Sequence, residues 1–235
     1  MKKEATISKF INPNVEKYKA KLKSLEIQYN LHINEKSEIE KILFEFQHQH
    51  TLELGSLIIK ILKLRKEKFS NDKEKFEEAE NDERQYQSQF NEEKDKQIIE
   101  LDDEQKTELK KKFRKASILC HPDKVNERYR EEAQETFINL KKAYDKNDLG
   151  KVSELLNNLE KNNFKSNSDT ISEIDNLKIL ITQLELKINN IINELVEIQN
   201  SETYITVLSI KDWNLYFKEK KNELIIEYEN LKNEK

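Results

Sequence analysis

Residues that form turns are nearly absent from this sequence. Its 235 residues include only two glycines and two prolines, whereas β-sandwiches and doubly wound sheets need many such residues in their connections. Charged residues make up 37% of the chain, and Lys, Glu, Leu and Ile are abundant. The scarcity of turn formers excludes sheet-based folds and predicts an all-α protein with long helices and few loops.

Cysteine and long hydrophobic runs are also scarce. The single cysteine, Cys120, cannot form a disulfide within the chain, which favours a reducing compartment. The richest apolar stretch, residues 57–64, is interrupted by two lysines and is too short to span a bilayer. No apolar run follows Met1-Lys2-Lys3, so we expect no secretory signal. These observations predict a cytoplasmic protein without a membrane partner.

Side chains that hold metals, cofactors or nucleic acid are weakly represented. His48 and His50 diverge on a helix, and no cysteine or third histidine completes a site, so we predict no metal and no cofactor. The net charge of −4 argues against nucleic-acid binding by the whole chain. Within Lys106–Lys124, however, seven basic residues stand against two acidic ones. This local charge suits an acidic surface on a partner protein, and nucleic acid is the weaker alternative.

Two apolar seams predict long helices in the N-terminal part of the chain. Pro13 stands where a first-turn proline belongs, and apolar residues then repeat at alternating spacings of three and four up to Tyr29. A second seam runs from Ile39 to Leu64. Gly55 lies beside it, where it either lets another helix approach closely or simply weakens the helix.

The C-terminal part has the most regular periodicity. Apolar residues from Ile174 to Ile198 alternate strictly at spacings of three and four, and others lie outside that seam. This wide apolar surface predicts packing against more than one helix. After a break at residues 200–201, Asp212 is placed to N-cap a last helix that carries Trp213 and Phe217.

These patterns divide the chain into six predicted segments. The arms at both ends are equally compatible with pairing within one chain and with a homodimer formed through coiled coils. The segments are an N-terminal tail (1–12), N-terminal coiled-coil helices (13–70), a charged helical connector (71–96), a central helix-pair domain (97–160), a linker (161–170) and a C-terminal helical hairpin or coiled coil (171–235).

The most specific feature is the tetrapeptide His121-Pro122-Asp123-Lys124, which we call the tip. Pro122 disfavours helical geometry at His121, so a preceding helix that is N-capped by Asp102 or Asp103 should end near Cys120. The tip is then predicted to project and to display an imidazole and a carboxylate. No nucleophile or convergent polar pocket accompanies it, which argues against general-base catalysis by His121.

Apolar stripes flank the tip on both sides at spacings of four, three and four. They predict two helices packed antiparallel, with a basic outer face beside the tip. Ile118 is an exposed apolar residue on that basic face, which indicates a contact surface. The predicted core residues are Leu109, Phe113, Ala116, Cys120, Phe137, Leu140 and Tyr144.

The segments KKKFRKASILCHPDK and FINLKKAY resemble the J domain of DnaJ-type co-chaperones. The resemblance implies that His121, Pro122 and Asp123 stimulate ATP hydrolysis by a DnaK-type chaperone. It covers about 50 residues, and Phe113 stands where the family often has tyrosine. By the same resemblance, the chaperone-binding face consists of Lys110, Lys111, Arg114, Lys115, Ile118 and Lys124.

The sequence departs from that family in its surroundings. The usual first-helix signature is missing, and only Ile98, Ile99 and Leu101 are candidates to cover the helix pair. The Gly/Phe-rich segment and the zinc-binding cysteine repeats of full-length DnaJ are absent. We therefore expect a non-enzymatic co-chaperone or adaptor whose client is unknown. The alternative is a structural coiled-coil scaffold with an inactive J-like module.

Overall fold

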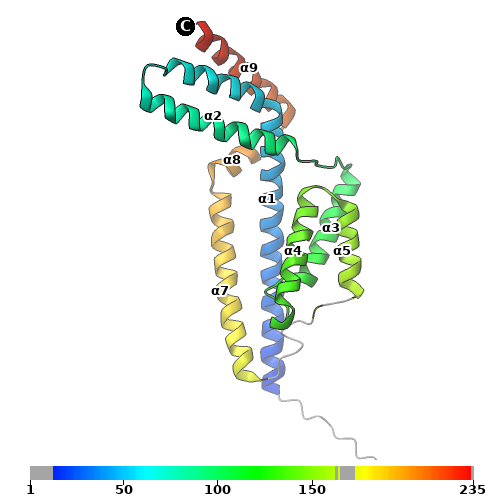
Figure 1. Cartoon of the computed structure of the whole chain (residues 1–235). Helices are drawn as coiled ribbons and strands as arrows, with labels where there is room; N and C mark the ends of the chain where they lie inside the picture. Colours follow the sequence, from blue (N-terminus) through cyan, green and yellow to red (C-terminus); the bar gives the residue numbers. More distant parts are fainter. Residues whose placement is uncertain (1–12, 162–163, 165–172, 234–235) are drawn as a thin grey trace, which may run out of the picture. The chain divides into compact units, whose positions relative to one another are not determined.

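The structure, a computed structural model, describes residues 13–161, 164 and 173–233. The predicted tail and most of the predicted linker lie outside these residues. The prediction of an all-α fold is confirmed, since the described residues contain helices and no strand (Figure 1). None of the described helices combines the length and apolar content of a membrane span. The helices are α1 (Pro13–Lys68), α2 (Lys73–Lys94), α3 (Asp103–Cys120), the short 3-10 helix η1 (Glu127–Tyr129), α4 (Arg130–Asp145), α5 (Leu149–Lys161), α7 (Ile174–Gln199), α8 (Glu202–Ser209) and α9 (Trp213–Asn233).

The chain forms two compact units. Unit 1 contains the residues up to Glu38 together with Ile99–Glu197, and unit 2 contains Ile39–Ile98 together with the residues from Ile198 onwards. The N-terminal region was expected to hold several helices, but α1 is a single helix of 56 residues that contributes to both units. The physical reason is that no glycine or proline separates the two apolar seams, so nothing interrupts the backbone hydrogen bonds between them.

In unit 1, residues 99–161 form a central module around one hydrophobic core. The rings of Phe113 and Tyr144 stack 4.0 Å apart, and those of His121 and Phe137 lie 4.8 Å apart, so α3 and α4 run antiparallel. Phe137, from the predicted core, is partly buried against the core cluster. The other predicted core residues are all buried, namely Leu109, Phe113, Ala116, Cys120, Leu140 and Tyr144.

A helix after the pair, not before it, completes this core. Residues 96–102 form no helix, and of the three residues expected to cover the pair only Leu101 packs against the core. Ile99 is 48% exposed, which corrects that expectation. Instead, α5 buries three side chains against α3 and α4, and it packs most extensively on α3. These side chains are Val152, Leu156 and Leu159.

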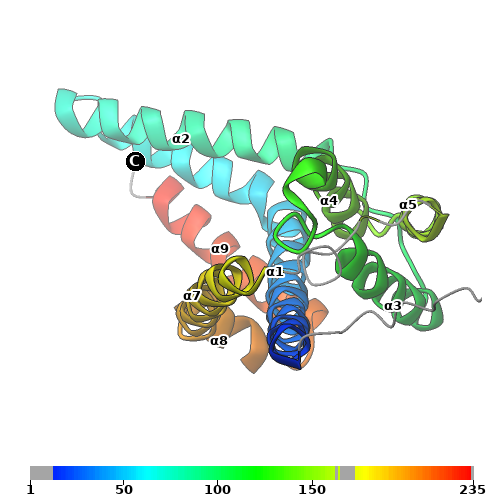
Figure 2. The ribbon, with the colours of Figure 1, turned by 90° about the horizontal axis from the view of Figure 1, so that it is seen from below.

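The rest of unit 1 is an arm, by which we mean α1 up to Glu38 together with α7. The α7 seam packs on α1, where Leu22 and Tyr29 meet apolar residues from Leu177 to Ile191. Figures 1 and 2 show α7 and the central module on different sides of this part of α1. The sequence left a C-terminal hairpin and a coiled coil open, and in the structure α7 buries its apolar seam against α1.

In unit 2, α8 and α9 pack against the later part of α1. Their core contains Phe46, Leu54, Val207 and Phe217, and the ring of Trp213 lies edge-on to Phe46 at 5.3 Å. As the sequence predicted, Asp212 caps α9, since its carboxylate accepts a hydrogen bond from a backbone N–H in the first turn (3.1 Å).

The charged segment after α1 also folds onto α1 in unit 2. A Cβ added at Gly55 would lie 2.8 Å from Cε2 of Phe90 in α2, so this glycine allows close approach of the two helices. His48 lies 3.0 Å from the Glu93 carboxylate. No cluster of metal-ligating side chains occurs among the residues that the structure describes.

Candidate functional site: the tip and its surroundings

Local sequence signals fix both ends of the helix before the tip. Asp102 and Gln105 form a reciprocal capping box at the start of α3. The helix ends at Cys120, and His121 is extended (φ −65°, ψ 124°), as Pro122 requires. The backbone N–H of Asp123 donates to Nδ1 of His121 (3.3 Å), which leaves the proton of a neutral ring on Nε2. The tip is therefore a closed turn with a defined imidazole orientation.

The His121 side chain is buried, which corrects the prediction of a projecting tip. It is 5% exposed. Phe137 packs on one side of the ring, and Tyr29 of α1 approaches edge-on at 5.2 Å and 88°. Burial lowers the pKa of His121 to about 4, although the nearby Asp123 carboxylate acts in the opposite direction. The imidazole is therefore neutral near pH 7.

Both carboxylate oxygens of Asp123 are engaged by the arm. Oδ2 accepts a hydrogen bond from the Tyr29 hydroxyl (2.8 Å), and Oδ1 accepts one from Nζ of Lys187 (2.5 Å). Burial opposes ionisation of Asp123, but the hydrogen bonds from Lys187 and Tyr29 outweigh it and keep the pKa of this carboxyl below its usual range. The pKa of Tyr29 is raised by its burial and by the Asp123 charge. The tip therefore presents an ionised carboxylate that is already satisfied.

One edge of the predicted basic face is turned toward α1. Ser117 is fully buried and its hydroxyl donates to Oδ1 of Asn34 (2.9 Å). The carboxylate of Glu38 accepts a hydrogen bond from Nε of Arg114 (2.7 Å) and pairs with Lys110 (2.8 Å). Lys110 and Arg114 are exposed, as predicted, but both pair with an acidic residue of the same chain, Glu38.

The other predicted face residues lie differently. Lys111 is exposed, Ile118 is 43% exposed, and Lys115 pairs with Glu160 of α5. Lys124 is half-buried, and its ammonium donates to the Ile118 carbonyl at 3.4 Å. Lys111, Lys115 and Ile118 thus form an edge of α3 that the arm does not cover.

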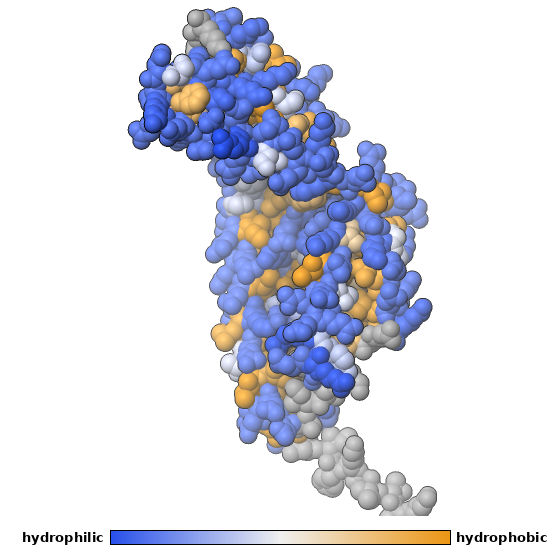
Figure 3. All heavy atoms as spheres, viewed as in Figure 1, coloured by the Kyte–Doolittle hydropathy of each residue, from blue (hydrophilic) through white to orange (hydrophobic). Residues whose placement is uncertain are grey.

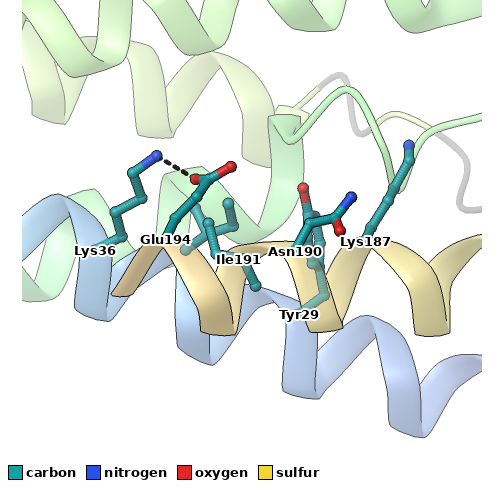
Figure 4. A pocket seen from close by; sticks show the side chains of 7 residues that line it. Tyr29, Lys36, Lys187, Asn190, Ile191 and Glu194 are labelled. Carbon is teal, nitrogen blue, oxygen red and sulfur yellow. Dashed lines mark hydrogen bonds and ion pairs between the residues drawn. The ribbon is translucent and has the colours of Figure 1, made fainter. Parts of the chain in front are cut away.

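A groove of about 320 Å³ lies between α1 and α7 next to the tip. Figure 4 shows Tyr29 and Lys187 extending from neighbouring helices past the rim of this groove, with Lys36 and Glu194 paired at its other end (2.6 Å). Of these four residues only Tyr29 entered the sequence prediction, as the last residue of an apolar seam, because both helices were assessed for apolar spacing alone. One signal in the sequence could have indicated that a second face of α1 is covered. Four polar residues recur on α1 at spacings of four, four and three, and all are buried in the structure: Glu26, Asn30, Asn34 and Ser37.

The Cys120 thiol beside the tip is in its unreactive, protonated form. Cys120 is fully buried, and burial raises its pKa to about 12, so it is protonated and shielded near pH 7. Near pH 7 the tip therefore carries an ionised carboxylate and a neutral imidazole beside a protonated thiol.

Comparison with known proteins agrees with this geometry. A family model described as the DnaJ domain matches residues 98–146, which span α3, the tip and α4. No curated protein and no solved structure matched the chain. A J domain implies a function of the co-chaperone type and an interaction with a DnaK-type chaperone. With the helix pair, the tip and the family match in agreement, residues 98–146 of the chain form a J domain.

Proposed function

We propose that the chain is a co-chaperone or adaptor that binds a DnaK-type chaperone and stimulates its ATP hydrolysis through His121, Pro122 and Asp123. The observation that carries this proposal is the intact tip at the end of α3, with His121 and Asp123 linked through Nδ1 and a backbone N–H. The protein itself breaks no bond and holds no cofactor; the hydrolysed nucleotide belongs to the partner.

The basic residues of α3 orient the partner in this proposal. Lys111 and Lys115 lie on the open edge with Ile118, Lys110 and Arg114 lie beside this edge, and Lys124 adds positive charge at the tip. Charge complementarity of this kind acts mainly on the association rate and on orientation. An acidic surface on the chaperone is therefore the expected docking partner.

The arm of unit 1 and the helices of unit 2 supply the surfaces for a client or for a second copy of the chain. Figure 3 shows polar side chains over most of the face in view, with apolar side chains in separate patches. A DnaK-type partner and a single buried thiol are both compatible with the cytoplasm, where we propose that the protein acts. Exposed apolar residues on the arm of unit 1 include Ile27, Leu31, Ile179, Leu186 and Val196.

The proposal is tested with the steady-state ATPase rate of a DnaK-type chaperone. The full chain at saturating concentration should raise this rate, and His121→Gln should abolish the increase, because the substitution removes the imidazole from the tip. His48→Gln is the matched control, since it makes the same change in unit 2, and it should stimulate like wild type. If neither the wild-type chain nor a variant without the arm contacts to Asp123 (Tyr29→Phe/Lys187→Gln) raises the rate, the module is an inactive part of a structural scaffold.

A further inference from the structure

The arm contacts the central module along the residues that the proposed function needs. Lys110, Arg114, Ser117 and His121 recur on α3 at spacings of four, three and four, which places them on one face of the helix. Each has a partner on α1. Arg114 meets Glu38, Ser117 meets Asn34, and His121 meets Tyr29.

These contacts form an ordered interface. The α1 partner moves toward the N-terminus as the α3 residue moves toward the tip, so the two helices pack antiparallel in a regular register. The carboxylate of Asp123 then closes the row by accepting hydrogen bonds from both arm helices, through Tyr29 of α1 and Lys187 of α7. A row of matched donors and acceptors indicates a specific docking surface on the arm.

The interface is polar where the arm's own core is apolar. The α1–α7 seam consists of leucine, isoleucine and tyrosine side chains. On α1, by contrast, Glu26, Asn30, Asn34 and Ser37 are buried. Oδ1 of Asn30 has no hydrogen-bond partner among the described residues. A buried polar surface with an unsatisfied acceptor is less stable than an apolar one, because water would satisfy these groups after separation.

Glu38 occupies two of the cations to which the acidic surface of the proposed partner would bind. Its carboxylate lies between Lys110 and Arg114 and is 21% exposed. An acidic chaperone surface that binds these cations must displace Glu38, and a chaperone that reaches the tip must displace Tyr29 and Lys187.

We infer that the arm is an internal docking surface that holds the J domain closed, and that a DnaK-type chaperone engages the tip only after the central module leaves α1 and α7. This inference rests on the proposed function, and it specifies how the same site is regulated. The closed form competes with the chaperone, so the apparent affinity of the chaperone is reduced in proportion to the fraction of open molecules.

The test removes both arm contacts to Asp123 and leaves every residue of the central module in place. The double variant Tyr29→Phe/Lys187→Gln keeps the aromatic ring against His121 but deletes the hydroxyl and the ammonium. The matched control is Tyr18→Phe/Lys178→Gln, which makes the same changes at another tyrosine–lysine pair on the same two helices (5.7 Å from Nζ to the ring centre). The full chain is used throughout.

At subsaturating concentration, the double variant should stimulate the chaperone ATPase about three- to tenfold more than wild type, since each lost hydrogen bond to a carboxylate shifts the closed–open equilibrium. The control should match wild type. Addition of His121→Gln to the double variant should remove the stimulation, which shows that the gain acts through the tip.

A physical measurement separates the inference from the proposed function. Spin labels are attached at Lys23→Cys on α1 and Gln134→Cys on α4, two exposed positions in unit 1. The double variant should show longer and broader label distances than wild type. Equal stimulation and equal distances in wild type and double variant would overturn the inference and leave the proposed function standing. Increased distances without stimulation by any variant would overturn the proposed function and, with it, the regulatory role of the arm.

Discussion

The Asp123 carboxylate and the His121 imidazole lie side by side, yet burial affects them differently. Asp123 keeps its charge because Lys187 and Tyr29 donate to it, whereas burial of His121 outweighs the attraction of the Asp123 carboxylate and keeps the imidazole neutral. The tip therefore combines one ionised and one neutral group within three residues. This combination makes the stability of unit 1 dependent on pH through the histidine.

We predict that stability falls in mild acid because of His121. The pKa of this group is about 4 in the folded chain and about 6.5 in an unfolded chain, so the unfolded state takes up the proton first as the pH falls. The free energy of unfolding should drop by about 2 kcal/mol between pH 7.5 and pH 5 on this account. Urea titrations followed by far-ultraviolet circular dichroism measure the change.

His121→Gln removes the titrating group and should lose correspondingly less stability over the same pH interval. His48→Gln, which leaves the tip intact, should retain the wild-type dependence. The same loss in wild type and in His121→Gln would contradict this origin of the pH effect.

Residue-scale prediction from the sequence worked where the signal was local. Spacing identified the buried face of α3, and Pro122 identified its end. The burial of His121 was missed because it depends on Tyr29, which donates to the neighbouring Asp123 across 94 positions of sequence. Periodicity indicates which face of a helix is covered but not which distant segment covers it.

In unit 2, the Phe90 ring of α2 packs against α1 at a residue without a side chain. Gly55 lies in the interior of α1, where alanine would ordinarily gain about 1 kcal/mol in helix propensity. The Phe90 ring occupies the space that a methyl group would need, and such overlap costs about 1–3 kcal/mol. We therefore expect Gly55→Ala to destabilise unit 2 by about 1 kcal/mol, measured by urea unfolding with Trp213 fluorescence.

The same substitution should change sign when the ring is removed. In a Phe90→Ala background, Gly55→Ala should stabilise unit 2, because only the propensity gain remains. The second glycine provides a control, since a Cβ at Gly150 meets only Oδ1 of Asp148, at 3.4 Å, and Gly150→Ala should cause no loss. Destabilisation by Gly55→Ala in both backgrounds would argue against the contact with Phe90.

Helix α5 covers the helix pair, which was not predicted from the sequence. Its apolar residues Val152, Leu156 and Leu159 have the spacing of a buried helix face, so the signal was present. We expected the covering residues before α3, because the first helix of the resembling family stands there. Packing energetics require only that the apolar face of the pair be covered, and a helix on either side of it in sequence can do so.

For the whole molecule, the limits of the J-domain match and of the folded module do not coincide. The match ends at residue 146, whereas the core includes side chains of α5 up to Leu159. Burial of three such side chains contributes about 5 kcal/mol, comparable to the total stability of a small domain. We predict that a fragment of residues 98–161 folds and that a fragment of residues 98–146 does not.

Thermal unfolding of the two fragments by circular dichroism checks this. The longer fragment should melt cooperatively, and the shorter one should show little cooperative loss of helix. Equal melting temperatures would mean that α5 adds nothing to the module. A Leu156→Ala change in the longer fragment serves as an intermediate, with a lower melting temperature than its parent.

The single cysteine has a practical consequence for the study of this chain. Because Cys120 is enclosed by the core of the central module, an alkylating reagent reaches it only in molecules whose core has parted. The rate at which Cys120 is alkylated therefore reports how often the core of the central module opens, and mass spectrometry measures this rate without any added probe. A cysteine introduced at an exposed position should react much faster than Cys120. Exposed labelling sites can therefore be added without removing the native cysteine.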